Sequence, residues 1–288
     1  RDTVRSSVSF TLAANVENLT LTGSAVIGTG NTLNNVIAGT AGSNLLQGGL
    51  GHDVLSGGAG VDDLRGGDGN DVLIPGAGID RADGAAGIDA ISYADATSSV
   101  QLTLLNDHSV TTGGAAAGDI VSNVEGLIGS RFSDTLLLNT AGANFASHAY
   151  GGAGNDNISV GIANVAGDTT IRVLRGDAGN DTLTGDRAIQ GAGQSTVEYF
   201  RLQYDQGFDF VRFFGPEDSL LISAAEFNLP SGLAGQPLPA SQFLSSTTPL
   251  ATTEFQRLIY ETDTGILWAD KDGNGDAFAS IPIAIFIS

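Results

Sequence analysis

Aspartate recurs at every ninth residue in the first third of the chain, and carboxylates at a fixed spacing can bind cations. Residues 48–56, 57–65 and 66–74 read GGLGHDVLS, GGAGVDDLR and GGDGNDVLI. Neighbouring units keep this register in a degraded form, and the sixth places of the series are Asn35, Asn44, Asp53, Asp62, Asp71, Asp80 and Asp89. The eighth places are Ile37, Leu46, Leu55, Leu64, Leu73, Ala82 and Ile91. A flexible Gly/Asp-rich linker would not keep an apolar residue at every eighth place, so the pattern predicts folded structure.

The elements that must position these residues follow from the order of residue types within a unit. Gly at the first, second and fourth places permits positive φ, so the first six places form a tight loop. The last three places form a very short strand with one apolar side chain pointing inward. One unit has no core, whereas stacked units bury a continuous row of apolar side chains. We expect two units to make one coil, so that successive units alternate between two sheets. Loops two units apart then lie directly above one another.

This stacking places the acids in two columns. Asp53, Asp71 and Asp89 form one column, and Asp62 and Asp80 form the other. Like charges stacked at close range repel, and buried carboxylates need a partner. Ca²⁺ takes roughly six to eight oxygen ligands, and tight turns supply backbone carbonyl oxygens beside the carboxylates. The repeat therefore predicts calcium between successive loops.

The units resemble the nonapeptide repeats of the RTX (repeats-in-toxin) family, whose pattern is G-G-x-G-x-D-x-U-x. The resemblance implies an all-β fold, a parallel β-roll (β-solenoid), with several Ca²⁺ ions held between its loops. It also implies the ligands of each ion: the second- and fourth-place carbonyls of one loop, the first- and third-place carbonyls of the loop one coil later, and both sixth-place carboxylates. Carried onto this sequence, the ligand sets are Gly49, Gly51, Asp53, Gly66, Asp68 and Asp71; Gly58, Gly60, Asp62, Pro75, Ala77 and Asp80; and Gly67, Gly69, Asp71, Gly84, Ala86 and Asp89. Sites with Asn35 or Asn44 lose a charge, so we expect them to be weaker or empty.

The resemblance extends on both sides of these units, which we call the first array. Residues 1–92 read as an N-terminal β-roll whose first 25 residues form calcium-poor coils of the same solenoid. Residues 93–128 resemble a spacer with a hairpin, and residues 129–190 resemble a second, irregular array. The sixth-place acids of the second array, which we expect to bind metal, are Asp134, Asp156 and Asp181, with Asp177 and Asp186 as further candidates.

The last part of the chain, residues 191–288, differs in composition. The last 99 residues hold 14 of the 19 aromatic side chains. The region is similar to the capping segment that closes RTX arrays and is associated with secretion, and an independent binding domain is the alternative. We expect strands and a short helix within residues 197–227.

A second acidic motif, DKDGNGD, occupies residues 270–276. Asp270, Asp272 and Asn274 match the first, third and fifth places of an EF-hand loop, and Gly275 matches the sixth. The twelfth place is Ile281 instead of a bidentate Glu. A cation site and a tight hairpin turn both remain open here.

Nothing in the sequence points to catalysis. His52, His108 and His148 are scattered, and His52 occupies a variable repeat place that we expect to be exposed. The sequence has no H-E-x-x-H, G-x-S-x-G or phosphate-cradling motif. The repeat register accounts for the strongest carboxylate pairs, so we expect no enzyme in this chain.

Composition bounds the partners. Asp and Glu number 32 against 12 Lys and Arg, a net charge of −20, which argues against nucleic acid and anionic membrane surfaces. No apolar run is long enough for a membrane span, and the lack of Cys excludes disulfides and thiolate sites. The chain has no Met and begins without a secretory signal, so we expect a fragment of a longer protein.

These observations and the resemblance lead to one expected function and two rivals. We expect a calcium-dependent folding, stability and export module of a large secreted or cell-surface bacterial protein, with the type I secretion machinery as partner. The first rival is a calcium-stabilised glycan-binding module attached to a polysaccharide-modifying enzyme, which predicts an exposed basic or aromatic groove. The second is an adhesin or S-layer segment in which calcium joins chains, with a bacterial or host surface as partner.

Overall fold

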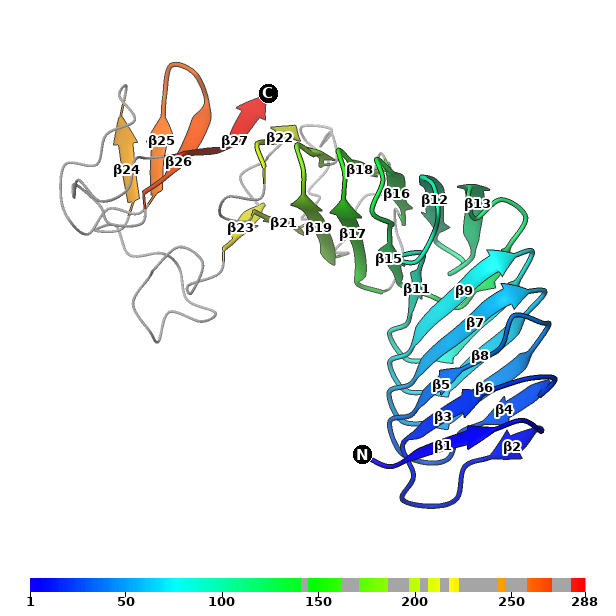
Figure 1. Cartoon of the computed structure of the whole chain (residues 1–288). Helices are drawn as coiled ribbons and strands as arrows, with labels where there is room; N and C mark the ends of the chain where they lie inside the picture. Colours follow the sequence, from blue (N-terminus) through cyan, green and yellow to red (C-terminus); the bar gives the residue numbers. More distant parts are fainter. Residues whose placement is uncertain are drawn as a thin grey trace.

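A computed structural model describes residues 1–140, 145–161, 171–185, 197–202, 207–212, 218–222, 243–246, 258–270 and 281–287. Within these residues every regular element is a β-strand, and the strands form two sheets that run through the stacked coils, which bend near β11 (Ala90–Ser92) and β13 (Val110–Gly114) (Figure 1). The expected all-β fold, a parallel β-roll, is confirmed. No helix in the described part of the chain has the length and apolar character needed to cross a membrane.

The first sheet has 11 described strands. In order across the sheet they are β1 (Thr3–Ser6), β3 (Asn18–Leu21), β5 (Val36–Ala38), β7 (Val54–Gly60), β9 (Val72–Gly78), β11 (Ala90–Ser92), β15 (Gly126–Ile128), β17 (Ser147–Ala153), β19 (Ile171–Ala178), β21 (Val197–Arg201) and β23 (Ser219–Leu221).

The second sheet has 16 described strands. In order they are β2 (Phe10–Thr11), β4 (Ile27–Thr29), β6 (Leu45–Leu50), β8 (Asp63–Asp68), β10 (Arg81–Ala86), β14 (Ile120–Ser122), β13 (Val110–Gly114), β12 (Val100–Leu105), β16 (Thr135–Asn139), β18 (Asn157–Val160), β20 (Thr182–Thr184), β22 (Asp209–Arg212), β27 (Ile281–Ile287), β26 (Ile266–Ala269), β25 (Leu258–Glu261) and β24 (Phe243–Ser246).

Two repeat units make one coil, as the spacing predicts. In the first array, odd-numbered strands pair with odd-numbered ones and even-numbered strands with even-numbered ones, always in parallel. Val54 pairs with Val72 in one sheet and Leu46 with Leu64 in the other. Loops one coil apart therefore lie directly above one another.

The array strands are longer than the short strands that the unit pattern predicts. β7 spans 7 residues and runs through the last three places of one unit into the glycines of the next. The reason is that the loops stack in the same register as the strands, so backbone hydrogen bonds continue from strand to loop. The Gly51 N–H, for example, donates to the Asp68 carbonyl at 2.8 Å.

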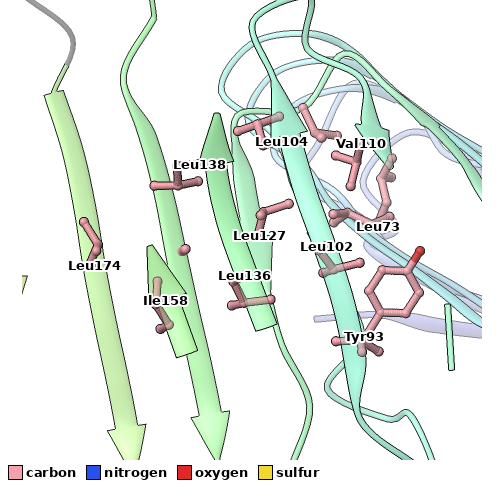
Figure 2. Close-up of a cluster of buried hydrophobic side chains, with 14 of the residues drawn as sticks. Leu73, Tyr93, Leu102, Leu104, Val110, Leu127, Leu136, Leu138, Ile158 and Leu174 are labelled. Carbon is pink, nitrogen blue, oxygen red and sulfur yellow. The ribbon is translucent and has the colours of Figure 1, made fainter. Parts of the chain in front are cut away.

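The core is the row of eighth-place side chains. Each of them has a relative exposure of 0 or 1%: Ile37, Leu46, Leu55, Leu64, Leu73, Ala82 and Ile91. Figure 2 shows the row passing into the second array through Leu102, Leu136 and Ile158. All three are buried, so one apolar core serves both arrays.

The N-terminal residues and the spacer both belong to the stack. β1 to β4 extend the two sheets at the N-terminal end. The expected hairpin is β12 and β13, which pair in antiparallel fashion inside the second sheet. β14 pairs in parallel with β10, and β15 with β11, so both sheets continue through the segment where the nine-residue period is lost (Figure 1).

The C-terminal region also continues the sheets. β21 pairs in parallel with β19, and β22 with β20; β27 then pairs in parallel with β22. β26 and β25 follow as antiparallel neighbours. The end of the segment with the expected helix, residues 223–227, lies outside the described residues, as does the acidic motif beyond Asp270. The division into four domains stays a prediction.

Candidate metal centre

The sixth-place carboxylates are linked along each column by backbone hydrogen bonds. Oδ1 of each acid accepts the N–H of the sixth-place residue one coil earlier. The Asn35, Asp53 and Asp71 N–H groups donate to Asp53, Asp71 and Asp89 at 2.7 Å each. In the second column the Asp62 N–H donates to Asp80 at 2.8 Å. The carboxylates are therefore ordered, buried and stacked.

The other oxygen of most of these carboxylates has no hydrogen-bond partner. This oxygen, Oδ2, is buried and unpartnered in Asp53, Asp62, Asp71, Asp80, Asp89, Asp156 and Asp181. These residues are at most 2% exposed, so bulk water does not reach their carboxylates. Burying an unpaired carboxylate oxygen is costly, and a native structure satisfies such groups with a partner. The same unpartnered oxygen in each of these loops indicates a position that can bind a cation.

Backbone carbonyl oxygens closely approach the glycines of the loops that carry the unpartnered carboxylate oxygens. The Gly49 and Gly51 carbonyl oxygens lie under 3.0 Å from where a Cβ on Gly67 and Gly69 would sit, one coil later. The Gly66 carbonyl oxygen belongs to the later loop. It lies 2.5 Å from the position that a Cβ would take on the first-place glycine of the Asp53 loop. Asp53 Oδ2 and the Gly66 carbonyl oxygen thus share one gap between successive loops, and the close approach of the carbonyls is why these places are glycine.

The third-place carbonyl of the first set, at Asp68, already accepts the Gly51 N–H at 2.8 Å. The equivalent carbonyl of the third set, at Ala86, accepts the Gly69 N–H at 2.8 Å. A carbonyl oxygen has two lone pairs, so each can still bind a cation.

The second and third ligand sets repeat this arrangement. The Gly58 and Gly60 carbonyl oxygens approach Gly76 and Gly78, one coil later. The Pro75 carbonyl oxygen approaches the first-place glycine of the earlier loop. In the third gap the Gly84 carbonyl lies 2.7 Å from the Cβ position on the first-place glycine of the Asp71 loop. In the second array Asp156 Oδ2 shares its gap with the Gly176 carbonyl, and Asp181 follows one coil later.

The conformation of the second-place residue separates two kinds of loop. In what we call open loops, this residue has positive φ and the carboxylate Oδ2 has no partner. The second-place residues of the open loops are Gly49, Gly58, Gly67, Gly76, Ala85, Gly152 and Asp177. Ala85 (φ 72°) and Asp177 (φ 70°) adopt this conformation although they are not glycine. Asp177 also forms an ion pair with Arg175.

In closed loops the second-place residue lacks positive φ, and its N–H donates to the sixth-place side chain of the same loop. Asn31 N–H donates to Asn35 Oδ1 at 2.8 Å, and Thr40 N–H donates to Asn44 Oδ1 at 2.6 Å. The asparagine amides donate back to carbonyls of the previous coil. This geometry supplies a reason for the expected weakness of the asparagine sites.

Asp134 also lies in a closed loop, although it is an acid in register. Its Oδ2 accepts the Ser130 N–H at 2.5 Å, and its Oδ1 accepts the Val100 N–H at 2.7 Å. Of the sixth-place aspartates that we expected to bind metal, Asp134 is the one whose two carboxylate oxygens both have protein donors. Asp186 lies outside the described residues.

Burial disfavours the charged form of the stacked acids. Burial, with a further contribution from Asp71, raises the pKa of Asp53 to about 6 and that of Asp89 to about 7. Burial likewise raises the pKa of Asp62 and of Asp71. Without metal the columns therefore bury negative charge that nothing compensates. A divalent cation supplies the compensating positive charge.

Three further carboxylates take sixth-place positions, and the sequence reasoning missed them. Asp119 accepts the Asp80 N–H at 2.8 Å, Glu125 accepts the Asp89 N–H at 2.7 Å, and Asp209 Oδ1 accepts the Asp181 N–H at 3.1 Å. A signal existed only for Asp209, because it follows Gly207 at the fourth place and precedes the buried Val211 at the eighth.

The histidines do not form a centre. His52 is exposed, as expected, and its Nδ1 accepts the Asn70 N–H at 2.7 Å in a ladder of fifth-place side chains. Within the described residues no group of three or more His, Asp or Glu side chains is placed to hold a metal.

The fold and the stacked oxygens together define a metal-binding β-roll. Four segments of the chain match the model of the RTX calcium-binding nonapeptide repeat, at residues 29–64, 56–91, 142–164 and 173–187. No curated protein sequence matched the chain. The chain therefore carries RTX repeats, which bind Ca²⁺ ions, and the expected cofactor is confirmed. The identity of each ligand stays a prediction.

Repeats of this kind also indicate a biological setting. Proteins that contain them are generally secreted, and the repeats imply a substrate of type I secretion.

Proposed function

We propose that this chain is a calcium-switched folding, stability and type I export module of a large secreted or cell-surface bacterial protein of the adhesin, S-layer or toxin kind. One observation carries the proposal: buried carboxylate oxygens without partners stack in columns beside backbone carbonyls. A fold built around such columns depends on the cation that fills them. The proposal includes no catalytic role, because the repeat accounts for the buried acids.

At low cytosolic calcium the columns oppose folding. Each coil would bury carboxylates whose charge is disfavoured there, and each unit contributes one apolar side chain to the core. The chain then stays disordered, which suits passage through a narrow secretion channel.

Outside the cell, calcium reverses this balance. Extracellular calcium modules bind with Kd on the order of 0.1 to 1 mM. At ten times Kd, each site adds roughly 1.4 kcal/mol to the stability of the folded state. Several such sites together are comparable with the whole stability of a domain, about 5–15 kcal/mol. Calcium should therefore switch folding rather than adjust it.

The far-UV circular dichroism of the metal-free chain during a calcium titration tests the switch, with magnesium as the control. We expect a cooperative gain of β signal near millimolar calcium and none with magnesium. A chain that contains no metal by elemental analysis and is nevertheless fully folded would end the proposal.

Folding outside the cell would also oppose return into the channel. β21, β22 and β27 continue the same sheets as the repeats, so folding that starts at the C-terminal end can propagate through the stack. The expected result is export that slows when external calcium is removed. An unchanged export rate would remove this part of the proposal and leave the folding switch intact.

One observation favours glycan binding as a second candidate. Tyr150, Arg175 and Arg201 are cross-strand neighbours on β17, β19 and β21, and all are partly exposed. The Arg175 guanidinium lies 5.5 Å from the centre of the Tyr150 ring, and the His148 ring lies 4.9 Å from it. Flat aromatic and basic surfaces suit sugar rings and acidic groups. A glycan array in calcium tests this candidate, and Tyr150→Ala should abolish any signal that it gives.

A further inference from the structure

The last loop of the first array, residues 84–89, is open although no repeat unit follows it. Asp89 is 1% exposed, and its Oδ2 is buried without a partner. Ala85 holds a φ of 72°, and a left-handed conformation costs an L-residue about 1–2 kcal/mol. The loop thus keeps a strained residue and an unsatisfied carboxylate oxygen at the place where the nine-residue period ends.

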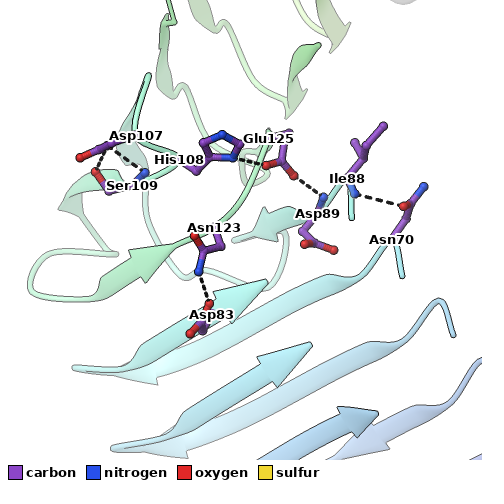
Figure 3. A network of polar contacts seen from close by, with 9 residues as sticks. All are labelled: Asn70, Asp83, Ile88, Asp89, Asp107, His108, Ser109, Asn123 and Glu125. Carbon is purple, nitrogen blue, oxygen red and sulfur yellow. Dashed lines mark hydrogen bonds and ion pairs between the residues drawn. The ribbon is translucent and has the colours of Figure 1, made fainter. Parts of the chain in front are cut away.

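The segment 123–125 lies where the next repeat loop would lie (Figure 3). The Asn123 carbonyl and Asp89 Oδ2 both lie under 3.0 Å from the Cβ position on Gly84, as the first-place carbonyl and the carboxylate do in the repeat gaps. Glu125 Oε2 accepts the Asp89 N–H at 2.7 Å, and the Glu125 N–H donates to the Asp89 carbonyl at 2.8 Å. Glu125 therefore takes the position of the sixth-place aspartate.

Neighbouring groups hold this segment in place. The Asn123 amide donates to Asp83 Oδ1 at 2.7 Å, and the Val124 N–H donates to the His108 carbonyl at 3.2 Å. The His108 ring bonds to Glu125 Oε1, the oxygen that does not accept the Asp89 N–H. Glu125 is 4% exposed and is fixed at both oxygens before any ion arrives.

We infer that the gap between Asp89 and Glu125 is a further Ca²⁺ site, with the Asp89 carboxylate, the Asn123 carbonyl and the Glu125 carboxylate among its ligands. Asn123 and Glu125 lie outside the segments that match the repeat model. The inference rests on the proposed function, because it assigns the same ion to the same kind of gap. His108 then ends the column by taking the remaining Glu125 oxygen.

The two other column ends share the carboxylate part of this arrangement. Asp80 and Asp181 keep an unpartnered Oδ2 in open loops, and their N–H groups donate to Asp119 and Asp209. In all three cases a carboxylate from outside the segments that match the repeat model follows the last open loop. The end of the column at Asp89 is thus built from the same kind of carboxylate contact as the other two.

Calcium stoichiometry of the full chain, measured by equilibrium dialysis with Ca²⁺ alone, tests the site in Glu125→Gln. The Gln carbonyl can still accept the Asp89 N–H, and its amide can face His108, so the segment keeps its shape while losing the charge. We expect Glu125→Gln to bind one ion fewer than the wild type. Unchanged stoichiometry and affinity would overturn the inference.

Two further variants separate this inference from the proposed function. Glu17→Gln is the matched control, because Glu17 also accepts a backbone N–H, from Asp2 at 2.7 Å, but lies in no open loop. It should bind as many ions as the wild type. Asp71→Asn should lose calcium if the repeats bind it. Loss in Asp71→Asn without loss in Glu125→Gln would overturn the further site alone, whereas a wild type that binds no calcium would overturn both.

A second measurement needs no variant. In crystals of the full chain grown with Tb³⁺ in place of calcium, we expect an anomalous peak between Asp89 Oδ2 and the Asn123 carbonyl. Peaks in the repeat gaps with none here would overturn the site even if Glu125→Gln failed to fold.

Discussion

At the scale of the residue, the second place of each loop decides whether a carboxylate is available to a cation. Positive φ there accompanies an unpartnered Oδ2, and its absence accompanies a hydrogen bond within the loop. Glycine adopts positive φ without strain, whereas Ser130 does not have it, and its N–H and hydroxyl both donate to Asp134. An aspartate in register is thus not sufficient for an open site.

Ser130→Gly should convert a closed loop to an open one. The substitution permits positive φ at the second place and removes the hydroxyl donor, so Asp134 Oδ2 can face the gap toward Asp156. We expect one additional Ca²⁺ per chain by equilibrium dialysis. The same ion count as in the wild type would show that the second-place residue does not control binding.

Gly67→Ala tests the opposite change. Gly67 has φ 118°, and a Cβ there would lie under 3.0 Å from the Gly49 carbonyl. We expect the free energy of unfolding in calcium to fall by at least about 1–3 kcal/mol, with weaker calcium binding. Urea denaturation at saturating calcium measures the change, and a midpoint equal to that of the wild type would contradict it.

At the scale of the element, the inserted segment supplies protein donors where the columns of the first array end. The Tyr93 hydroxyl, just after β11, donates to Asp119 Oδ2 at 2.8 Å, and His108, in the turn between β12 and β13, bonds to Glu125. Burial raises the pKa of Tyr93, and the nearby Asp119 raises it further. Tyr93 therefore stays a neutral donor. Because Tyr93 and His108 already bond to the outer oxygens of Asp119 and Glu125, these oxygens need no further cation.

Tyr93→Phe should destabilise the chain without changing its calcium count. The substitution leaves Asp119 Oδ2 buried without a donor, which costs about 1–3 kcal/mol. Urea denaturation at saturating calcium and dialysis stoichiometry are the two readouts. A lower ion count would show instead that Tyr93 supports a metal site.

The apolar row inside the coils gives a prediction of its own. Leu73 is 0% exposed, so Leu73→Ala should lower the free energy of unfolding by about 2–5 kcal/mol. Val61 is 62% exposed on a neighbouring loop, and Val61→Ala should change it by no more than about 0.5 kcal/mol. Equal effects of the two substitutions would argue against the observed core.

At the scale of the whole molecule, the stacked acids make the metal-free chain sensitive to pH. Burial raises the pKa of Asp53 to about 6 and that of Asp156 to about 7, from a value of 3.8 in the unfolded chain. Between about pH 4 and pH 7 the folded state binds more protons than the unfolded state, so its stability falls as pH rises through that window.

The metal-free chain should therefore fold better in mild acid than at neutral pH. We expect a larger β signal in far-UV circular dichroism near about pH 4.5 than near about pH 7.5, in protein stripped of metal. With saturating calcium the order should reverse, because protons compete with the ion for the same carboxylates. A metal-free signal that grows with pH would contradict the raised pKa values.

The sequence alone determined the two-sheet coil, the buried row and the identity of the ion. Each follows from local and periodic properties: glycine permits the tight loops, one apolar residue per unit must point inward, and acids at a fixed spacing must stack. The residues from Asp53 to Asp89 show this, since the eighth- and sixth-place residues lie in the predicted rows and columns.

Only the tertiary structure decided where the columns end and which loops are open. Asp119 and Glu125 have no periodic signal, because they lie in the segment where the nine-residue period is lost. The path of the inserted hairpin brings them to the positions above Asp80 and Asp89. Ser130 and Ala85 could not be classed from sequence either. The φ of such a residue depends on how its loop stacks on the next coil, and that contact forms only in the folded chain.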